Sequence, residues 1–419
     1  MKKLKSETTG EIKKHTLKNG SKLSEEIGSL PHGIIDKRET GIGATFAELT
    51  SKRNSIIVEP LKVTAVAKSK EHNAFYYGSD TDTMKRPTIK EIKNFLNNKS
   101  IKYKKIIVVS DSLPKLMQHI PKEERENYFL MIDEVDSVQM DSGFRPSMEK
   151  VMKIYKEHPQ NMRCLITATI LEFHDPALQH EPYHQYEYET PTVRDINIIA
   201  TENPIGLAFD KIEQLLNHNE GEKIVLAYNN VTVLNEVAKR LVEKGGLEKY
   251  QVGILCGASS KEKTDFYTEL TSDTLPTLVN LKTSAYYNGY DIKEKYHLLT
   301  IVDGKDSYNS LSEKNLKQIS GRARNGLLSE TIIVMDNGEI HTEEILTEDL
   351  IKAAQYEIDA LDCIRNHFDK NNVLKNMYGE IQGLISEKVN VYNYPILKIN
   401  EEGKFEISYL RSIFKKLLF

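Results

Sequence analysis

Short, nearly continuous apolar runs recur along this sequence, and stretches with helical periodicity separate them. In the first half of the chain the runs cover residues 55–58, 105–109, 128–132 and 163–166. Strands that are buried on both faces of a parallel sheet have this composition, whereas strands with one solvated face alternate apolar and polar residues. The pattern therefore predicts an α/β fold in which βαβ units form a parallel sheet flanked by helices.

A second series of the same kind follows residues 183–191, whose His, Tyr, Glu and Pro side chains indicate a linker or an excursion. Its apolar runs lie at 195–200, 223–227, 251–255, 277–281, 297–302 and 331–335, and its helices include 206–218 and 232–244. Beyond about residue 340 the pattern predicts a helix over 342–365, a hairpin over 394–409 that turns at 401–403, and a short basic helix.

These patterns divide the chain of 419 residues into two domains and two smaller regions. At ~100–200 residues per domain, this length suggests two or three domains that each bury a core. We predict a polar lead-in (1–30), a first α/β domain (31–192), a second α/β domain (193–340) and a small accessory region of helices and a hairpin (341–419). The lead-in is either a loose segment or a short strand and helix.

The composition is that of a globular protein without a global charge signal. The formal net charge is −4, so any nucleic-acid binding has to come from local basic patches in a groove. Apolar runs stay well below the ~18 residues that a membrane span needs, and the polar start has no signal-peptide pattern. The three cysteines lack metal-ligand spacing. We therefore expect a cytoplasmic protein with reduced thiols and no membrane partner.

The strongest local signal is an apolar strand that ends in adjacent carboxylates, Asp133 and Glu134. Ligands of open α/β sheets gather at the carboxyl ends of the strands. We assign Asp133 to hold Mg²⁺ on nucleotide phosphates and Glu134 to orient or deprotonate an attacking water. The alternative is a helix start that acidic residues stabilise. Thr167 and Thr169, at the end of the next strand, can bond the acids or simply cap a helix.

A second candidate group is the pair of arginines in residues 318–324. Arg322 and Arg324 follow a glycine, and their guanidinium groups can meet developing phosphate charge, with Gln318 one turn before them. In phosphoryl transfer an arginine of this kind contributes ~10³–10⁵ in rate. Surface salt bridges are the alternative.

Upstream of the arginines, a Thr-Ser pair and a Gly-Tyr-Asp sequence follow an apolar run. Thr283 and Ser284 can bind a backbone phosphate, and Gly289 and Asp291 can couple to the nucleotide. Loop capping and turn chemistry are the alternative for all four.

In combination and order these residues resemble the motifs of superfamily 2 helicases and translocases. The last segment has the Gly-Arg-x-Arg form that is similar to the herpesvirus origin-binding helicase group. The order holds across about residues 33–340. The matching segments are 56–61 (motif Ia), 108–116, 132–136 (the DExD/H box), 167–169 (motif III), 223–229 (motif IV), 283–291 (motif V) and 318–324 (motif VI).

The resemblance implies two RecA-like P-loop domains with ATP and Mg²⁺ between the lobes and a nucleic-acid strand crossing both. It assigns catalytic roles to Asp133, Glu134, Gln318, Arg322 and Arg324. It also implies nucleic-acid contacts by Pro60, Ser110, Asp111, Ser112, Thr283 and Ser284. Bases can stack on Tyr286 and Tyr287, although these tyrosines can equally be ordinary packing residues.

One departure from the family concerns the phosphate-binding loop, for which residues 39–45 are the candidate. Its glycines, Gly41 and Gly43, allow the backbone to approach phosphates, and Thr40 belongs to the same candidate nucleotide-binding loop. Thr45 occupies the place of the Mg²⁺-binding hydroxyl. Ala44, however, occupies the place of the lysine that meets the β- and γ-phosphates. The loop is therefore a degenerate Walker A sequence.

Three interpretations of this loop stay open. Lys37 or Arg38, just upstream, can supply the missing charge. Alternatively, hydrolysis is crippled and the protein is a nucleotide sensor or scaffold. In the third interpretation this turn is not the phosphate loop at all. The intact acid and arginine pairs favour the first, because an inert relic has no chemical need to keep both.

The sequence thus predicts an ATP-dependent helicase or translocase that acts on single-stranded or duplex nucleic acid, with DNA expected rather than RNA. By analogy, its compact size suggests a replication or repair motor of a virus or mobile element, with replication proteins as further partners. The alternative is a helicase-like nucleic-acid-binding or scaffold protein with weak or no ATP hydrolysis, because Ala44 replaces the lysine.

Overall fold

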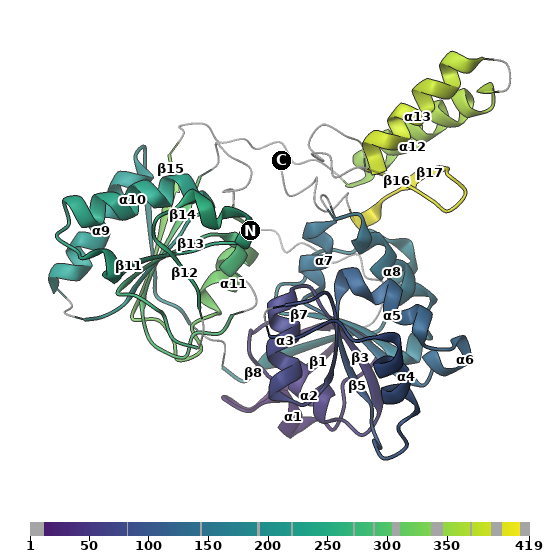
Figure 1. The fold of residues 1–419 in the computed structure, drawn as a ribbon, viewed down its shortest axis with the longest axis horizontal. Helices are drawn as coiled ribbons and strands as arrows, with labels where there is room; N and C mark the ends of the chain where they lie inside the picture. Colours follow the sequence, from purple (N-terminus) through teal and green to yellow (C-terminus); the bar gives the residue numbers. More distant parts are fainter. Residues whose placement is uncertain are drawn as a thin grey trace. The chain divides into compact units, whose positions relative to one another are not determined.

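A computed structural model places the chain in two compact units, which are described separately (Figure 1). The first unit comprises residues 1–190 together with 343–419, and the second comprises residues 191–342. The structure describes residues 12–81, 83–142, 145–190, 193–218, 221–270, 273–287, 290–303, 311–336, 347–368, 371–386 and 396–410.

The first unit contains a parallel sheet of eight strands in the order β1-β8-β2-β7-β6-β3-β5-β4. The strands are β1 (Ile12–Leu17), β2 (Gly33–Asp36), β3 (Asn54–Glu59), β4 (Phe75–Tyr77), β5 (Lys105–Val109), β6 (Tyr128–Asp133), β7 (Arg163–Thr167) and β8 (Tyr183–Tyr188). The helices between them are α1 (Leu23–Glu26), α2 (Ala44–Thr50), α3 (Lys62–Glu71), α4 (Ile89–Asn97), α5 (Leu113–His119), α6 (Lys122–Arg125), α7 (Val135–Asp141) and α8 (Ser147–Glu157), with 3₁₀ turns η1 (Ser110–Ser112), η2 (Gln160–Met162) and η3 (Pro176–Leu178).

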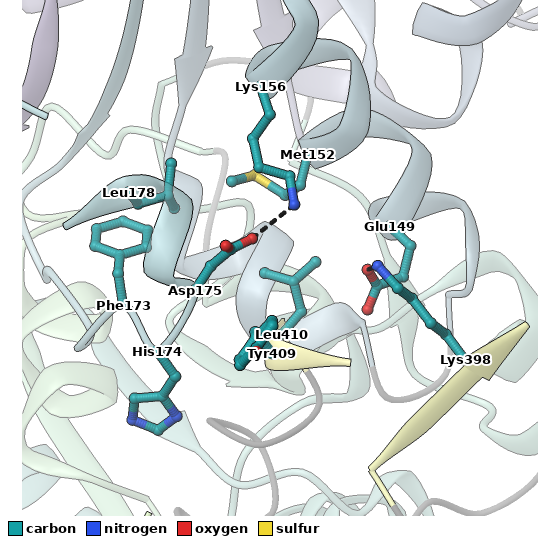
Figure 2. Close-up of a pocket in the computed structure, with 10 residues that line it drawn as sticks. All are labelled: Glu149, Met152, Lys156, Phe173, His174, Asp175, Leu178, Lys398, Tyr409 and Leu410. Carbon is teal, nitrogen blue, oxygen red and sulfur yellow. Dashed lines mark hydrogen bonds and ion pairs between the residues drawn. The ribbon is translucent and has the colours of Figure 1, made fainter. Parts of the chain in front are cut away.

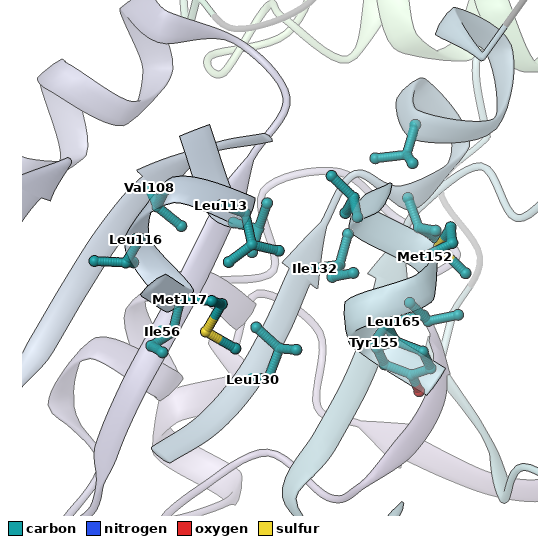
Figure 3. Close-up of a cluster of buried hydrophobic side chains, with 14 of the residues drawn as sticks. Ile56, Val108, Leu113, Leu116, Met117, Leu130, Ile132, Met152, Tyr155 and Leu165 are labelled. Atoms are coloured by element: carbon teal, nitrogen blue, oxygen red, sulfur yellow. The ribbon is translucent and has the colours of Figure 1, made fainter. Parts of the chain in front are cut away.

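Both faces of this sheet are covered, which explains why its central strands are apolar throughout. Alternate residues of one strand point to opposite faces. Leu130 and Ile132 of β6 face the core that α4, α5, α7 and α8 cover (Figure 3), whereas Phe129 and Met131 face the core beneath α1, α2 and α3. The first unit is therefore a sheet between two helical layers.

The second unit has a parallel sheet of seven strands in the order β12-β11-β13-β10-β14-β15-β9. Helices α9 and α10 cover one face, and α11 packs against the other. The elements are β9 (Ile196–Thr201), α9 (Pro204–His218), β10 (Ile224–Ala227), α10 (Val231–Glu243), η4 (Lys249–Gln251), β11 (Val252–Leu255), η5 (Ala258–Lys263), β12 (Tyr267–Thr268), β13 (Val279–Lys282), η6 (Ser284–Tyr286), β14 (His297–Val302), α11 (Glu313–Ser320) and β15 (Ser329–Met335).

The C-terminal region forms a small core of its own from α12 (Thr347–Arg365), α13 (Asn372–Ser386) and the antiparallel pair β16 (Leu397–Ile399) and β17 (Phe405–Ile407). This pair agrees with the hairpin predicted over 394–409. Among the residues that the structure describes, no helix is both long and apolar enough to cross a bilayer.

Residues 396–410 pack on helix α8 of the first unit (Figure 2). Ser408 donates a hydrogen bond to Glu149. Lys398 forms an ion pair with Glu149, in which Nζ lies 3.4 Å from Oε2. Leu410 joins the core of the first unit, and a small pocket lies where these segments meet. The C-terminal region therefore belongs structurally to the first unit.

The predicted fold class is confirmed: two parallel sheets are each flanked by helices, and a small helical and hairpin region follows. The lead-in contains the short strand and helix that were one of its two interpretations, β1 and α1. The interpretation of residues 183–191 as a linker or an excursion is wrong, because this stretch contains β8, which pairs with β1 and β2. These strands carry His, Gln, Lys and Glu, because part of each is exposed near the sheet edge, so they lack the apolar signature of the central strands.

A pair of histidines joins β1 and β8. The rings of His15 and His184 stack with their centroids 5.3 Å apart, and His15 Nε2 lies 3.1 Å from His184 Nδ1. Burial and the nearby charges of His15, Lys13 and His32 lower the pKa of His184 to about 4.

This histidine pair should make the first unit sensitive to acid. Between about pH 6.5 and pH 4 the unfolded chain binds a proton that folded His184 does not bind, so the free energy of unfolding falls as the pH falls. We expect the wild-type protein to lose about 1–3 kcal/mol more than His184→Gln when urea unfolding, followed by circular dichroism, is compared at about pH 7 and about pH 4.5. Equal losses in the two proteins would contradict this assignment.

Candidate active site

Four neighbouring strands of the first sheet, β2, β7, β6 and β3, end at one edge and bring together charged and hydroxyl side chains. In the parallel register Thr167 lies beside Asp36, and Asp133 lies beside Ile166. Glu59 ends β3, the next strand along. In α/β sheets this carboxyl edge is where ligands bind.

The predicted phosphate loop connects β2 to α2 at this edge. Gly41 and Gly43 have φ values of 74° and 82°, in the left-handed region that residues with side chains rarely adopt. Ile42 between them is buried in the core beneath α1, α2 and α3, which fixes the turn, and Thr40 lies in the same turn. Ala44 begins α2, is buried, and brings no charge. The turn therefore contains two left-handed glycines and has no lysine at its end.

Asp133 is the centre of the site. Its Oδ2 accepts a hydrogen bond of 2.5 Å from Thr45 Oγ1 and one of 3.1 Å from Lys68 Nζ, and its Oδ1 lies 3.4 Å from Lys37 Nζ. Burial alone would raise the pKa of Asp133, but the charges of Lys37 and Lys68 and the Thr45 bond hold this pKa well below its usual range. The carboxylate is therefore ionised, and it ties α2, α3 and the end of β2 to β6.

Glu134 adopts a conformation that is costly for a residue with a side chain. Its φ and ψ are 46° and 54°, in the left-handed region. Its N–H donates to Asp133 Oδ1 over 3.0 Å, its Oε1 lies 3.4 Å from Lys37 Nζ, and its side chain is 25% exposed. Strain of this kind is concentrated at functional sites. The backbone thus holds a partly exposed carboxylate beside the buried one.

Thr167 and Thr169 bond the acidic cluster, as one of the two sequence interpretations predicted. The hydroxyl of Thr167 donates to Asp136 Oδ1 and that of Thr169 to Asp136 Oδ2, both over 2.6 Å. Thr167 Oγ1 also lies 3.2 Å from Glu134 Oε2, so its one hydrogen can serve either acid. Burial and the charge of Glu134 raise the pKa of Asp136 to about 6. The strand end therefore links the two acids through hydroxyl groups.

Two members of the site were missed by the sequence analysis. Lys68 on α3 reaches Thr45 Oγ1 at 3.1 Å and Glu59 Oε1 at 2.8 Å. Glu59 ends a buried apolar strand just as Asp133 does, so the same signal could have identified it. Lys68 has no comparable signal, because it is one of several lysines on its helix.

Of the two basic residues proposed to replace the missing lysine, the structure brings only Lys37 to the acids. Arg38 has a positive φ of 54°, and its guanidinium pairs instead with Asp36 (3.0 Å) and Gln185 (3.0 Å). The interpretation that Arg38 supplies the charge is therefore not supported by its position.

The oxygen donors of Thr45 and Asp133 fit Mg²⁺, which binds proteins through one or two carboxylates while phosphates and waters complete its shell. Their oxygens lie within hydrogen-bond distance of one another, so both can face one ion. In the described part of the chain no group of three or more His, Cys, Asp or Glu side chains is arranged to hold a metal unaided. A metal here would therefore depend on its nucleotide.

Two of the four predicted nucleic-acid residues of the first unit, Pro60 and Asp111, contact Arg145. Its Nη2 lies 2.6 Å from Asp111 Oδ2 and 3.5 Å from the carbonyl oxygen of Pro60. Ser110 is buried and donates to the backbone carbonyl at the end of β3, and Ser112 precedes α5. Asp111 and Ser112 thus remain partly or fully exposed at the carboxyl edge, whereas the hydroxyl of Ser110 is occupied within the fold.

The arginines of the second unit meet on Asp291. Arg324 Nη2 lies 2.7 Å and Arg322 Nη1 lies 3.7 Å from Asp291 Oδ1, and Arg322 Nε donates to the carbonyl of Gln318 over 3.2 Å. The side chain of Arg322 is 8% exposed, whereas that of Arg324 is 25% exposed. Arg324 is therefore the more accessible guanidinium. Gly289, predicted beside Asp291, lies outside the described residues.

Thr283 and Ser284 follow β13 at the carboxyl edge of the second sheet. Thr283 is buried, and its N–H donates to the carbonyl of Leu255 over 3.0 Å. Ser284 is exposed, and its N–H donates to Asn229 Oδ1 over 3.1 Å. The exposed hydroxyl of this pair is therefore that of Ser284.

The suggestion that bases stack on Tyr286 and Tyr287 is wrong. Both side chains are buried, with exposed fractions of 9% and 6%. Tyr286 stacks on Tyr290 with ring centroids 4.6 Å apart, and Tyr287 packs in the core beneath α11. These rings stabilise the second unit, which was the alternative interpretation.

Comparisons with known proteins concern the fold. No family model matches the chain, and no curated protein matches its sequence. Mss116p bound to ssRNA and AMP-PNP is similar in structure, with a TM-score of 0.49 and 15% identity over 86% of this chain and 84% of that one. S. cerevisiae Dbp5 bound to RNA and ADP BeF3 has a TM-score of 0.49 and 13% identity over 77% and 84%. The DUF1998 helicase MrfA bound to DNA has a TM-score of 0.46 and 13% identity over 91% and 59%.

The central position of Asp133 predicts a loss of stability when it is removed. Asp133→Ala leaves two buried or half-buried ammonium groups with fewer acceptors, so we expect the free energy of unfolding to fall by about 2–4 kcal/mol. The control is Glu157→Ala, which removes a carboxylate whose side chain is 63% exposed. This change should alter the free energy of unfolding by less than about 0.5 kcal/mol. Denaturant unfolding measures both, and an Asp133→Ala protein as stable as wild type would show that this carboxylate does not organise the site.

Proposed function

We propose that this protein is a nucleic-acid-dependent ATP hydrolase of the helicase or translocase kind. One observation carries the proposal: the Thr45 hydroxyl and the buried Asp133 carboxylate meet at 2.5 Å, at the carboxyl edge of a parallel sheet and after a glycine-bearing turn. Two ammonium groups adjoin the same carboxylate. Oxygen donors for a divalent cation and cations for phosphates are what a nucleoside triphosphate site requires.

In this proposal Thr45 and Asp133 hold Mg²⁺, and the backbone of residues 40–44, with its two left-handed glycines, faces the phosphates. Bound there, Mg²⁺ would neutralise charge on the transferring phosphoryl group. Lys37 stays paired with Asp133 and Glu134, so its positive charge lies between the two carboxylates. Its own burial favours loss of the proton, but the charges of Asp133 and Glu134 raise its pKa.

Glu134 is proposed as the residue that orients and deprotonates the attacking water. It is the partly exposed carboxylate beside the metal-binding one, and its strained backbone fixes its direction. A proton accepted there can be shared through the Thr167 hydroxyl with Asp136. General-base help of this kind contributes ~10²–10⁴ in rate.

The second unit is proposed to supply Arg322 and Arg324, with Gln318, to the developing phosphate charge. In this structure Asp291 pairs with both guanidinium groups. Gly289 belongs to the same proposed segment. Nucleic acid is proposed to contact the accessible residues that follow β5 and β13, which are Asp111, Ser112 and Ser284. The other predicted contacts, Pro60, Ser110 and Thr283, are buried and are proposed to shape these two edges. DNA is the expected substrate, from the resemblance to the origin-binding group.

A second candidate is a helicase-like module that binds nucleic acid without productive hydrolysis. The observation in its favour is Ala44, which leaves the phosphate loop without the cation that hydrolysis uses. Rates of ATP hydrolysis separate the two candidates directly.

We expect wild-type protein to hydrolyse ATP faster when single-stranded DNA or RNA is added. Glu134→Gln should lower kcat by about 10²–10⁴, and Arg324→Ala should lower it by about 10³ or more. Lys295→Ala, which removes an exposed cation of the second unit, should leave the rate unchanged. Phosphate release in a coupled assay measures all four proteins. A wild-type rate equal to that of an Asp133→Ala/Glu134→Gln double variant would exclude the enzyme and favour the binding module.

A further inference from the structure

The proposed site lacks a lysine on its phosphate loop, yet a triphosphate needs positive charge beside its terminal phosphates. Within the described chain, the ammonium groups within hydrogen-bond distance of Asp133 belong to Lys37 and Lys68. The two lysines differ in depth, in partners and in what Mg²⁺ would do to those partners. These differences decide which of them is free to bind phosphate.

Lys68 comes from α3 and bonds Asp133 Oδ2, whereas Lys37 approaches Asp133 Oδ1. Ala65 and Ser69 on the same helix are buried, which sets α3 against the sheet. The Lys68 side chain is 25% exposed and that of Lys37 is 7% exposed, so Lys68 is the less deeply buried of the two. Nζ lies 3.1 Å from both Thr45 Oγ1 and Asp133 Oδ2, the two proposed ligands of the metal.

An ammonium group has three N–H donors, and those of Lys68 have three acceptors: Glu59, Asp133 and Thr45. A divalent cation bound by Asp133 and Thr45 would take two of these acceptors and repel the ammonium. Lys68 would then keep Glu59 and have two donors free beside the metal. Phosphate oxygens that share this metal are the acceptors such donors would meet.

Glu59 is placed to keep its hydrogen bond to Lys68 when Asp133 and Thr45 bind the metal. It is fully buried, its Oε1 lies 2.8 Å from Lys68 Nζ, and its Oε2 has no partner in the described chain. Ser110 fixes the backbone of Glu59 through its carbonyl oxygen. A buried carboxylate oxygen without a partner is costly to keep. Its retention next to a lysine is explained if that lysine has to be positioned when its other acceptors leave.

Lys37 is less suited to this task. Its side chain is 7% exposed, and its ammonium lies 3.4 Å from both Asp133 Oδ1 and Glu134 Oε1. Neither contact involves Thr45 or Asp133 Oδ2. A metal at the Thr45 side would therefore leave Lys37 where it is, neutralising the acids.

We propose that Lys68 is the phosphate-binding lysine of this site and replaces, from a different helix, the charge that Ala44 lacks. The inference rests on the proposed function, since it requires a nucleotide in this site. It assigns to Glu59 the positioning of Lys68 and to Lys37 the neutralisation of the acids.

The test is a titration of the full chain with a fluorescent ATP analogue in the presence of Mg²⁺, repeated with the corresponding AMP analogue. We expect Lys68→Ala to weaken binding of the ATP analogue by about ten- to a hundredfold and to leave binding of the AMP analogue within about twofold. Lys68→Arg should restore part of the affinity. Lys70→Ala, which removes an exposed lysine from the same helix, should bind both analogues as wild type does.

Lys68→Met retains most of the buried stem without the charge. It replaces Lys68→Ala in the titration if circular dichroism shows that the Lys68→Ala protein is unfolded. Wild-type affinity for the ATP analogue in a folded Lys68→Met or Lys68→Ala protein would overturn the proposal. So would an equal loss for the ATP and AMP analogues, since that result indicates a general disturbance of the site. Failure of the wild-type protein to bind either analogue would instead refute the proposed function itself, and the inference with it.

Discussion

The buried charge of Asp133 is the constraint on which the candidate site depends. An ionised carboxylate inside a protein is tolerated only when opposite charges and hydrogen bonds surround it. Here Thr45, Lys37 and Lys68 supply them from three different elements of the chain. The positions of α2, α3 and the end of β2 at the sheet edge are therefore coupled through one side chain, and the edge is organised before any ligand arrives.

The cluster combines stabilising ion pairs with two features that cost free energy. The lysines satisfy Asp133, but Glu134 keeps a left-handed backbone and Glu59 keeps an oxygen without a partner in the described chain. Interactions that serve only folding would relieve such costs. A ligand that brings a divalent cation and phosphates would use these groups, which is the chemical reason to propose nucleotide binding at this edge and not at the histidine pair or the C-terminal pocket.

Much of the fold was predictable because the central strands are buried on both faces and so are almost purely apolar. The edge strand β1 and its neighbour β8 were harder to predict, since their partial exposure admits His, Lys and Glu. In the site, Asp133 and Thr45 were predictable because each follows a recognisable local pattern. Lys68 was not, because only the tertiary packing of α3 brings it to a residue 65 positions away. The sequence analysis also proposed Arg38 as a source of the missing charge. Its left-handed backbone and its ion pair with Asp36 have no sequence signature, so this position could not be foreseen.

The most direct test is a crystal structure of the full chain with a non-hydrolysable ATP analogue and Mg²⁺. The account predicts the metal bound by Thr45 Oγ1 and Asp133, with Lys68 moved from Asp133 to a phosphate oxygen while still bonded to Glu59. A nucleotide bound away from the carboxyl edge of the first sheet, or a loop of residues 40–44 that makes no contact with its phosphates, would contradict it.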